Sequence, residues 1–135
     1  SLIVSNLRTS HRKEGIGKLR AYCGVISAGC GAACGICYQD GGDLEAVSHT
    51  LVNALAVNSG VVCDGAKPIC AAKIASAIEA GLLGYEMYRH GSQFRGGEGI
   101  VSKGVENTIR NISRLAREGM QETDREIIEI MTACC

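Results

Sequence analysis

The sequence predicts an all-α fold, a compact helical domain built around a buried central helix rich in glycine, alanine and cysteine. Apolar residues recur at helical spacing through most of the chain, and no segment alternates convincingly as a strand. The only proline stands where a helix can begin. Aromatic residues make up only 4% of the chain while glycine reaches 18 residues, so the core helices must approach one another closely.

The composition limits the class of protein. A chain of 135 residues is long enough for one core and too short for two, so we expect a single domain over residues 1–135. Charged residues are 21% and the formal net charge is zero, which gives no electrostatic reason to expect a nucleic acid or a membrane as partner. No apolar run reaches the roughly 18 residues of a membrane span, so we expect a cytoplasmic protein. The chain opens at Ser1 in mid-pattern, which suggests a fragment of a longer enzyme.

The central helix is expected over about 18–38, and four of its cysteines share one face. At about 100° per residue they fall within roughly 60° of one another, at Cys23, Cys30, Cys34 and Cys37. Gly31 and Gly35 form a neighbouring smooth stripe suited to close helix contact. Packing explains Cys34 and Cys37 best, because free cysteine behaves as a small hydrophobe. Their C-x-x-C spacing resembles a redox pair, but no βαβ pattern surrounds it.

Two further helices are expected in the middle of the chain. Asp43 is predicted to cap a helix over about 44–58, whose apolar residues recur at helical spacing. His49 falls off that apolar stripe, which favours a surface or supporting role. Pro68 belongs in the first turn of a helix over about 68–89, because the N–H that proline lacks would have no partner there.

The last third of the chain is expected to contain an exposed connector and two helices. Residues from about 90 to 103 are polar and rich in glycine. An amphipathic helix is predicted over about 105–120. Thr123 is then predicted to cap a final helix over about 124–132, with Glu126 completing a capping box. Three apolar residues of this helix are expected to face inward, namely Ile127, Ile130 and Met131.

Eight cysteines in one domain of this size call for an explanation. A disulfide scaffold is disfavoured, because such scaffolds are small and rich in loops, whereas these cysteines lie in apolar, helix-like segments. Ligation of a metal or a cluster in a reducing cytosol explains the count better.

The stretch 62–73 concentrates the residues suited to such a site. It holds two cysteines, two lysines, one aspartate and the only proline. Cys63 is expected on a loop and Cys70 near a helix start, where the helix dipole and free N–H groups stabilise thiolates. A third thiolate from the cysteine-bearing helix would leave one iron of a cluster open to act as a Lewis acid. A zinc site is the other candidate.

The motif in this stretch resembles the signature of the serine dehydratase-like α domain, in its L-cysteine desulfidase branch. The matching residues run Cys63-Asp64-Gly65-Ala66-Lys67-Pro68-Ile69-Cys70, followed by Lys73. The resemblance covers nearly the whole chain, through Gly29-Cys30-Gly31-Ala32, Gly41-Gly42 and the closing segment from Glu118 to Met131. It implies an oxygen-sensitive [4Fe–4S] enzyme that removes ammonia from L-cysteine or L-serine by elimination, giving pyruvate with sulfide or water.

The resemblance also implies roles for residues. Cys63 and Cys70 would be two ligands of the cluster, and either Cys23 or Cys30 the third, with the spacing in the family favouring Cys23. Lys67 or Lys73 would neutralise the substrate carboxylate or the anionic cluster. Asp64 would cap the helix or orient Lys67. The general base belongs to the N-terminal part of the family enzyme, so that part is an expected partner and the isolated domain is expected to be inactive.

Some questions stay open at the level of the sequence. In some serine dehydratases of the superfamily a terminal cysteine folds back onto the open iron, and Cys134 and Cys135 suggest the same plug. The alternative function is a non-catalytic module that binds a metal or a cluster, and a purely structural domain is a third reading. The preference between serine and cysteine, and the presence of a homodimer, are not decided by the sequence.

Overall fold

The computed structural model describes residues 22–133, and within them it confirms the all-α prediction. The described residues contain no strand, only an isolated antiparallel bridge between Tyr22 and Val62. None of the helices within this range has the length and apolarity needed to cross a lipid bilayer. In chain order the elements are α2 (Gly24–Gln39), α3 (Leu44–Val57), α4 (Ile69–Arg89), α5 (Val105–Arg114), the π-helical turn η2 (Leu115–Gly119) and α6 (Gln121–Ala133).

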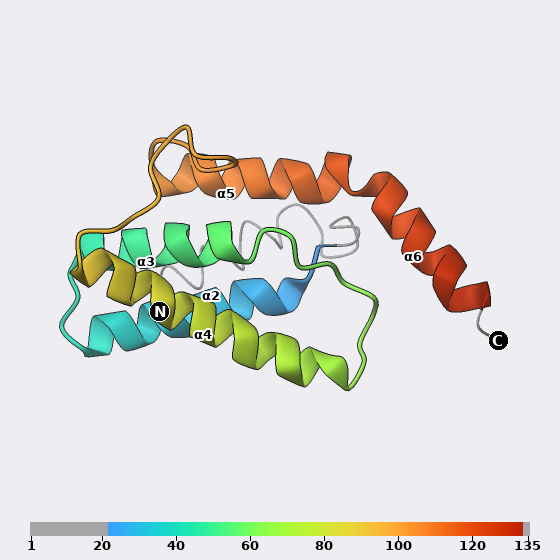
Figure 1. Cartoon of the computed structure of the whole chain (residues 1–135), viewed down its shortest axis with the longest axis horizontal. Coiled ribbons are helices and arrows are strands. Elements are labelled where there is room, and N and C mark those ends of the chain that lie inside the picture. The colour runs from blue at the N-terminus through green and yellow to red at the C-terminus, as the bar shows by residue number, and fades with distance from the viewer. Residues whose placement is uncertain (1–21, 134–135) are drawn as a thin grey trace.

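Helices α2, α3 and α4 pack against one another and form the core (Figure 1). Helix α5 lies along α3, and α6 leads away from the other helices (Figure 1). The four cysteines predicted to share a face are all buried, and they belong to one hydrophobic cluster with Leu51, Leu55 and Ala77. The buried Asn53 links α3 to α4, because its side-chain N–H donates to the Gly84 carbonyl of α4 over 2.9 Å.

Helices α2 and α4 approach closely at two glycines. A Cβ added at Gly29 would collide with the Ala77 side chain, and one added at Gly81 would collide with that of Ala33. The expected close contact therefore exists, but Gly35 takes no part in it, since nothing lies within 4 Å of a Cβ added there. The pattern within one helix indicated a smooth surface, and the register between the two helices decides which glycine is used.

The N-terminal ends of the helices partly match the predictions. Helix α2 begins at Gly24, later than expected, and Cys23 stands at its N-cap position. Helix α3 has the predicted cap, because the Asp43 carboxylate accepts a hydrogen bond from the Ala46 N–H over 2.9 Å. Pro68 has helical dihedral angles and directly precedes Ile69, the first residue of α4.

The Asp43 cap gives a direct stability prediction. Replacing Asp43 with alanine leaves one N–H of the first turn of α3 without its partner, so we expect a loss of about 1 kcal/mol in the free energy of unfolding. Urea denaturation of the chain measures this loss. The Asp43→Asn variant is the control, since asparagine caps as well as aspartate, and it should unfold close to the wild-type midpoint.

Past α5 the structure corrects the predicted helix boundaries. The helix expected over 105–120 widens into the π-helical turn η2, in which the Met120 N–H donates to the Leu115 carbonyl over 3.0 Å. Thr123 does not cap the last helix and no capping box with Glu126 starts it, because α6 already begins at Gln121.

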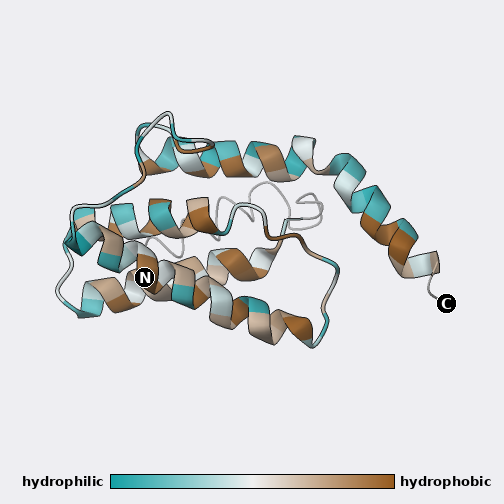
Figure 2. Cartoon of the chain, in the orientation of Figure 1, coloured by the Kyte–Doolittle hydropathy of each residue, from teal (hydrophilic) through white to brown (hydrophobic). Residues whose placement is uncertain are grey.

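The apolar face of α6 is also more exposed than predicted. Ile127 packs against the core cluster, but Ile130 and Met131 are 57% and 40% exposed. These apolar residues lie on the part of the chain that leaves the core (Figure 2). An apolar stripe in the sequence shows that a helix has such a face, and it does not show what covers it.

Candidate functional site

The antiparallel bridge brings two of the predicted cysteines to the same place. Tyr22 pairs with Val62, so the residues that follow them, Cys23 and Cys63, are diagonal neighbours across the pair. Diagonal neighbours in an antiparallel pair lie about 7–8 Å apart and their side chains point to the same face. The start of α2 and the loop before α4 are thus joined where each carries a cysteine.

Cys70 comes to this place from the first turn of α4. Its sulfur lies 3.5 Å from the Lys67 backbone nitrogen, which donates to it, and 3.5 Å from the Gly65 carbonyl oxygen. Gly65 has a φ of +90°, a conformation that glycine adopts without steric cost, and this allows the loop to turn into the helix. Cys63 and Cys70 are both half-buried.

The pKa of the Cys23 thiol depends on burial and on three side chains of the site, those of Cys63, Cys70 and Lys73. The thiol is buried, and this burial is the main cause that raises its pKa. The backbone N–H of Val25 lowers the pKa of Cys23, as does the Lys73 ammonium, whereas the thiols of Cys63 and Cys70 raise it. These groups therefore lie near enough to Cys23 to act on the charge of its thiol, and the bridge places Cys63 diagonal to it.

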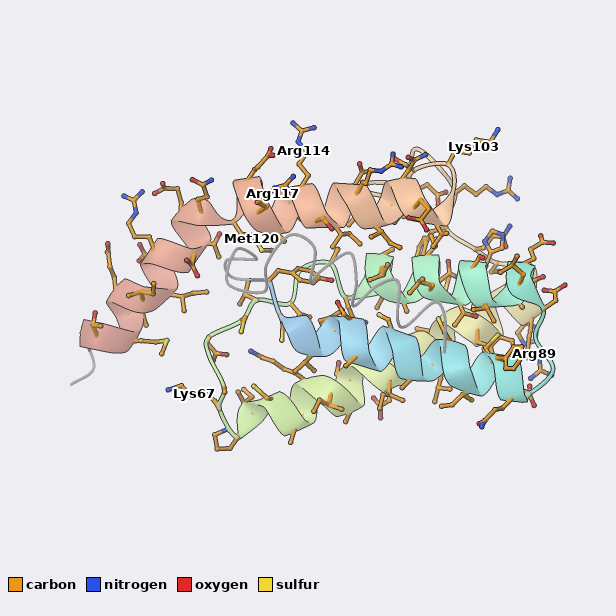
Figure 3. The ribbon with its side chains drawn as sticks, turned by 180° about the vertical axis from the view of Figure 1, so that it is seen from behind. Lys67, Arg89, Lys103, Arg114, Arg117 and Met120 are labelled. Carbon is orange, nitrogen blue, oxygen red and sulfur yellow. The ribbon has the colours of Figure 1, made fainter. Side chains whose placement is uncertain are left out.

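Lys73 is held inside the site and is not an exposed residue at a helix start. Its ammonium donates to Asp64 Oδ1 over 2.7 Å and to the Val62 carbonyl over 3.0 Å, and the side chain is only 17% exposed. The hydrogen bond from Lys73 lowers the pKa of Asp64 and raises that of Lys73. Asp64 therefore orients Lys73 and not Lys67, contrary to the sequence-based expectation. Lys67 is exposed, and its side chain points away from the domain (Figure 3).

Cys30 lies elsewhere. It is fully buried in α2, and burial raises its pKa to about 12, with the thiol of Cys34 as the next cause. Cys63 and Cys70 are not among the groups that shift it. Of the two candidates for the third ligand, the structure brings Cys23 to the other two cysteines.

The remaining cysteines of the described range have packing roles. The Cys34 thiol lies 3.8 Å from the Val47 carbonyl, to which it donates, and burial raises its pKa to about 12. Cys37 is buried under Gly42, where an added Cβ would meet its sulfur. All six cysteines in residues 22–133 are free thiols, which agrees with the argument against a disulfide scaffold. Cys134 and Cys135 lie outside the described residues.

A single metal ion and a cluster require different spacings of their ligands. In the part of the chain that the structure describes, no three histidine, cysteine or acidic side chains are close enough to hold a single metal ion. A cubane cluster holds its cysteines farther apart, because each sulfur binds a different iron. Cys23 and Cys63 are related as diagonal neighbours across the bridge, a separation larger than a single zinc ion requires of two thiolate ligands.

Two features of the site were not visible in the sequence. The bridge between Tyr22 and Val62 is a long-range contact without a local signal. An open hollow of about 270 Å³ also borders the site, lined by Ile26, Val61, Ile69, Ala72, Lys73 and Ser76. The position of Lys73 near Cys70 could have been predicted from the sequence, because Lys73 follows Cys70 by three residues and so lies on the same helix face. His49 lies apart in α3, stacked on Tyr88 with ring centroids 5.4 Å apart.

Comparison with known proteins identifies the family of the chain. Residues 1–129 match the sequence profile described as the serine dehydratase alpha chain. The chain belongs to this family. No solved structure matches the chain.

Family relatives are found in several bacteria. A UPF0597 protein of Desulfitobacterium hafniense is 62% identical over 135 residues, which is all of this chain and 31% of the relative. UPF0597 proteins of Treponema denticola and Finegoldia magna are 48% and 46% identical over 130 residues, 96% of this chain. The chain thus spans just under a third of the length of these relatives.

Proposed function

We propose that this chain is the cluster-binding domain of an iron–sulfur lyase that eliminates ammonia from L-cysteine, giving sulfide and pyruvate, or from L-serine, giving pyruvate. The proposal is supported by membership of the serine dehydratase alpha chain family, together with the bridge that sets Cys23 beside Cys63 and the position of Cys70 in the first turn of α4. Three cysteine ligands would hold a [4Fe–4S] cluster and leave one iron without a protein ligand.

The residues of the site support this chemistry in different ways. When bound, the cluster would supply an open Lewis-acidic iron, which makes a hydroxyl or thiol a better leaving group. The backbone N–H of Val25 and the Lys73 ammonium lower the pKa of Cys23, which favours the thiolate form needed for ligation. Lys67 is exposed and donates its backbone N–H to the Cys70 sulfur, and its side chain would have to turn back toward the site to pair with a substrate carboxylate.

The general base is proposed to come from another part of the longer protein. Among the described residues, the titratable side chains that act on Cys23 are two cysteines and Lys73, and Asp64 is already paired with that lysine. Relatives are about three times as long as this chain. Ile69 and Ile74 of α4, 54% and 44% exposed, offer the added part an apolar surface beside the site.

Cytoplasmic location fits the reduced thiols and the oxygen sensitivity of such clusters.

Anaerobic reconstitution with iron and sulfide tests the proposal. We expect a brown protein that contains iron and sulfide in equal amounts, and we expect Cys63→Ala to abolish it. Cys34→Ala is the matched control, because Cys34 is buried in α2 away from the site, and it should still bind the cluster. A colourless protein that binds one zinc ion tightly would overturn the cluster assignment.

The longer relative from Desulfitobacterium hafniense tests the reaction. After the same reconstitution we expect it to release ammonia and pyruvate from cysteine or serine, and the isolated chain to release none. A relative that holds its cluster and forms no pyruvate from either amino acid would favour the non-catalytic module.

A further inference from the structure

Lys73 joins the two elements that carry Cys63 and Cys70. It lies on α4, one turn after Cys70, and its ammonium reaches back to the preceding loop. The two acceptors on that loop are the Val62 carbonyl at 3.0 Å and Asp64 Oδ1 at 2.7 Å. These residues stand immediately before and after Cys63. One side chain of α4 therefore holds both neighbours of a cysteine that is not itself on the helix.

The surroundings of Lys73 strengthen these contacts. Hydrogen bonds from an ammonium to a carboxylate are charge-assisted and stronger than neutral ones. The Lys73 side chain is 17% exposed and Asp64 is 40% exposed, so solvent screens the pair less than it screens a surface pair. An ammonium has three donors, and the two acceptors on the loop leave one for a further partner.

The charge of Lys73 also reaches the other two cysteines. Lys73 follows Cys70 by three residues on α4 and so lies on the same helix face, and the neighbours of Cys63 that it binds include Val62, which the bridge links to the residue before Cys23. Three thiolates in one place repel one another, and a fixed cation among them reduces that repulsion. Lys67 belongs to the same motif, but its side chain is exposed and is hydrogen-bonded to neither neighbour of Cys63 among the described residues.

We propose that Lys73 is a positioning residue, which fixes the loop that carries Cys63 to α4 and offsets the negative charge of the three cysteine ligands. This assigns Lys73 to the assembly of the site and leaves Lys67 as the lysine available to a substrate. The part of the proposal that concerns the charge rests on the proposed cluster. The part that concerns the loop does not, because the contacts of Lys73 exist without any ligand.

Hydrogen exchange on the apoprotein tests the loop contacts. In Lys73→Met the stem keeps its length and the ammonium is lost, so we expect the amides of residues 61–66 to exchange about tenfold faster or more. Lys73→Arg should restore part of the protection, since it keeps the charge with a different geometry. Lys67→Met is the matched control and should exchange like the wild type. Circular dichroism confirms that each variant is folded.

Cluster retention tests the charge. After reconstitution, Lys73→Met should lose its visible absorption to a chelator several times faster than the wild type or Lys67→Met. Unchanged exchange in Lys73→Met would overturn the loop contacts, and unchanged cluster loss would overturn the role of the charge. If the wild type binds no cluster at all, the proposed function and the charge role both fail, while faster exchange in the apoprotein still supports the loop contacts.

Discussion

The Cys23→Ala variant is expected to bind no stable iron–sulfur cluster, whereas the Cys30→Ala variant is expected to bind it as the wild type does. Cys23 stands at the N-cap of α2, where the bridge between Tyr22 and Val62 places it beside Cys63. Cys30 is nearly two turns further along α2, fully buried, with Cys34 as the thiol that acts on it.

Iron and sulfide content together with visible absorption measures the difference after anaerobic reconstitution. Both substitutions remove a buried sulfur, so a general loss of packing predicts similar effects for the two variants. The comparison therefore separates ligation from stability. Cluster binding that survives in Cys23→Ala and disappears in Cys30→Ala would transfer the third ligand to Cys30, and loss in both would point to packing. Cys23→Ser retains the size of the side chain and should still lose the cluster.

Local sequence patterns predicted the features of the fold that depend on neighbouring residues. The cysteine face of α2 followed from helical periodicity, and the capping role of Asp43 followed from residue type and position. The placement of Cys63 on a loop and Cys70 at a helix start followed from Pro68, which cannot donate a backbone hydrogen bond. Each of these inferences uses residues within a few positions of one another.

Features that depend on distant contacts were not predicted. Apolar periodicity extended the first helix back to about residue 18, but Tyr22 pairs with Val62 and the helix begins only at Gly24. The partner of Lys73 was missed for the same kind of reason, since Asp64 lies nine residues earlier on a loop. The π-helical turn before Met120 has no signature in residue type. The candidate ligands could be named from the sequence, where the family spacing already favoured Cys23 over Cys30, and the fold adds the bridge that sets Cys23 beside Cys63.

The contact between α2 and α4 leads to the second prediction with a large effect. Gly81→Ala should lower the free energy of unfolding by about 2 kcal/mol, because overpacking a core contact costs about 1–3 kcal/mol. The added Cβ would overlap the Ala33 Cβ, and an alanine has no flexible end that could move aside. One of the two helix backbones must shift instead. Urea denaturation, followed by circular dichroism, measures the loss.

Ala33→Gly should rescue this variant. Apart from the Ala33 Cβ, the atoms nearest to a Cβ added at Gly81 are the Ala33 Cα at 3.6 Å and the Gly29 carbonyl oxygen at 3.8 Å, which are ordinary contact distances. Removing the Ala33 methyl therefore clears the obstruction. The double variant has the same number of interface methyls and helical glycines as the wild type, and we expect it to unfold within about 0.5 kcal/mol of it. Ala33→Gly alone should cost about 1–2 kcal/mol through helix propensity and the lost methyl.

The Gly81→Ala and Ala33→Gly substitutions should also affect the candidate site. Helix α2 presents Cys23 at its start and α4 presents Cys70, so the distance between these helices sets the distance between two proposed ligands. Gly81→Ala should therefore weaken cluster retention, and the double variant should restore it. Gly35→Ala is the control, since open space surrounds that position, and it should stabilise the chain by about 0.5–1 kcal/mol. Strictly additive losses in the double variant would show that the two helices do not meet at this pair.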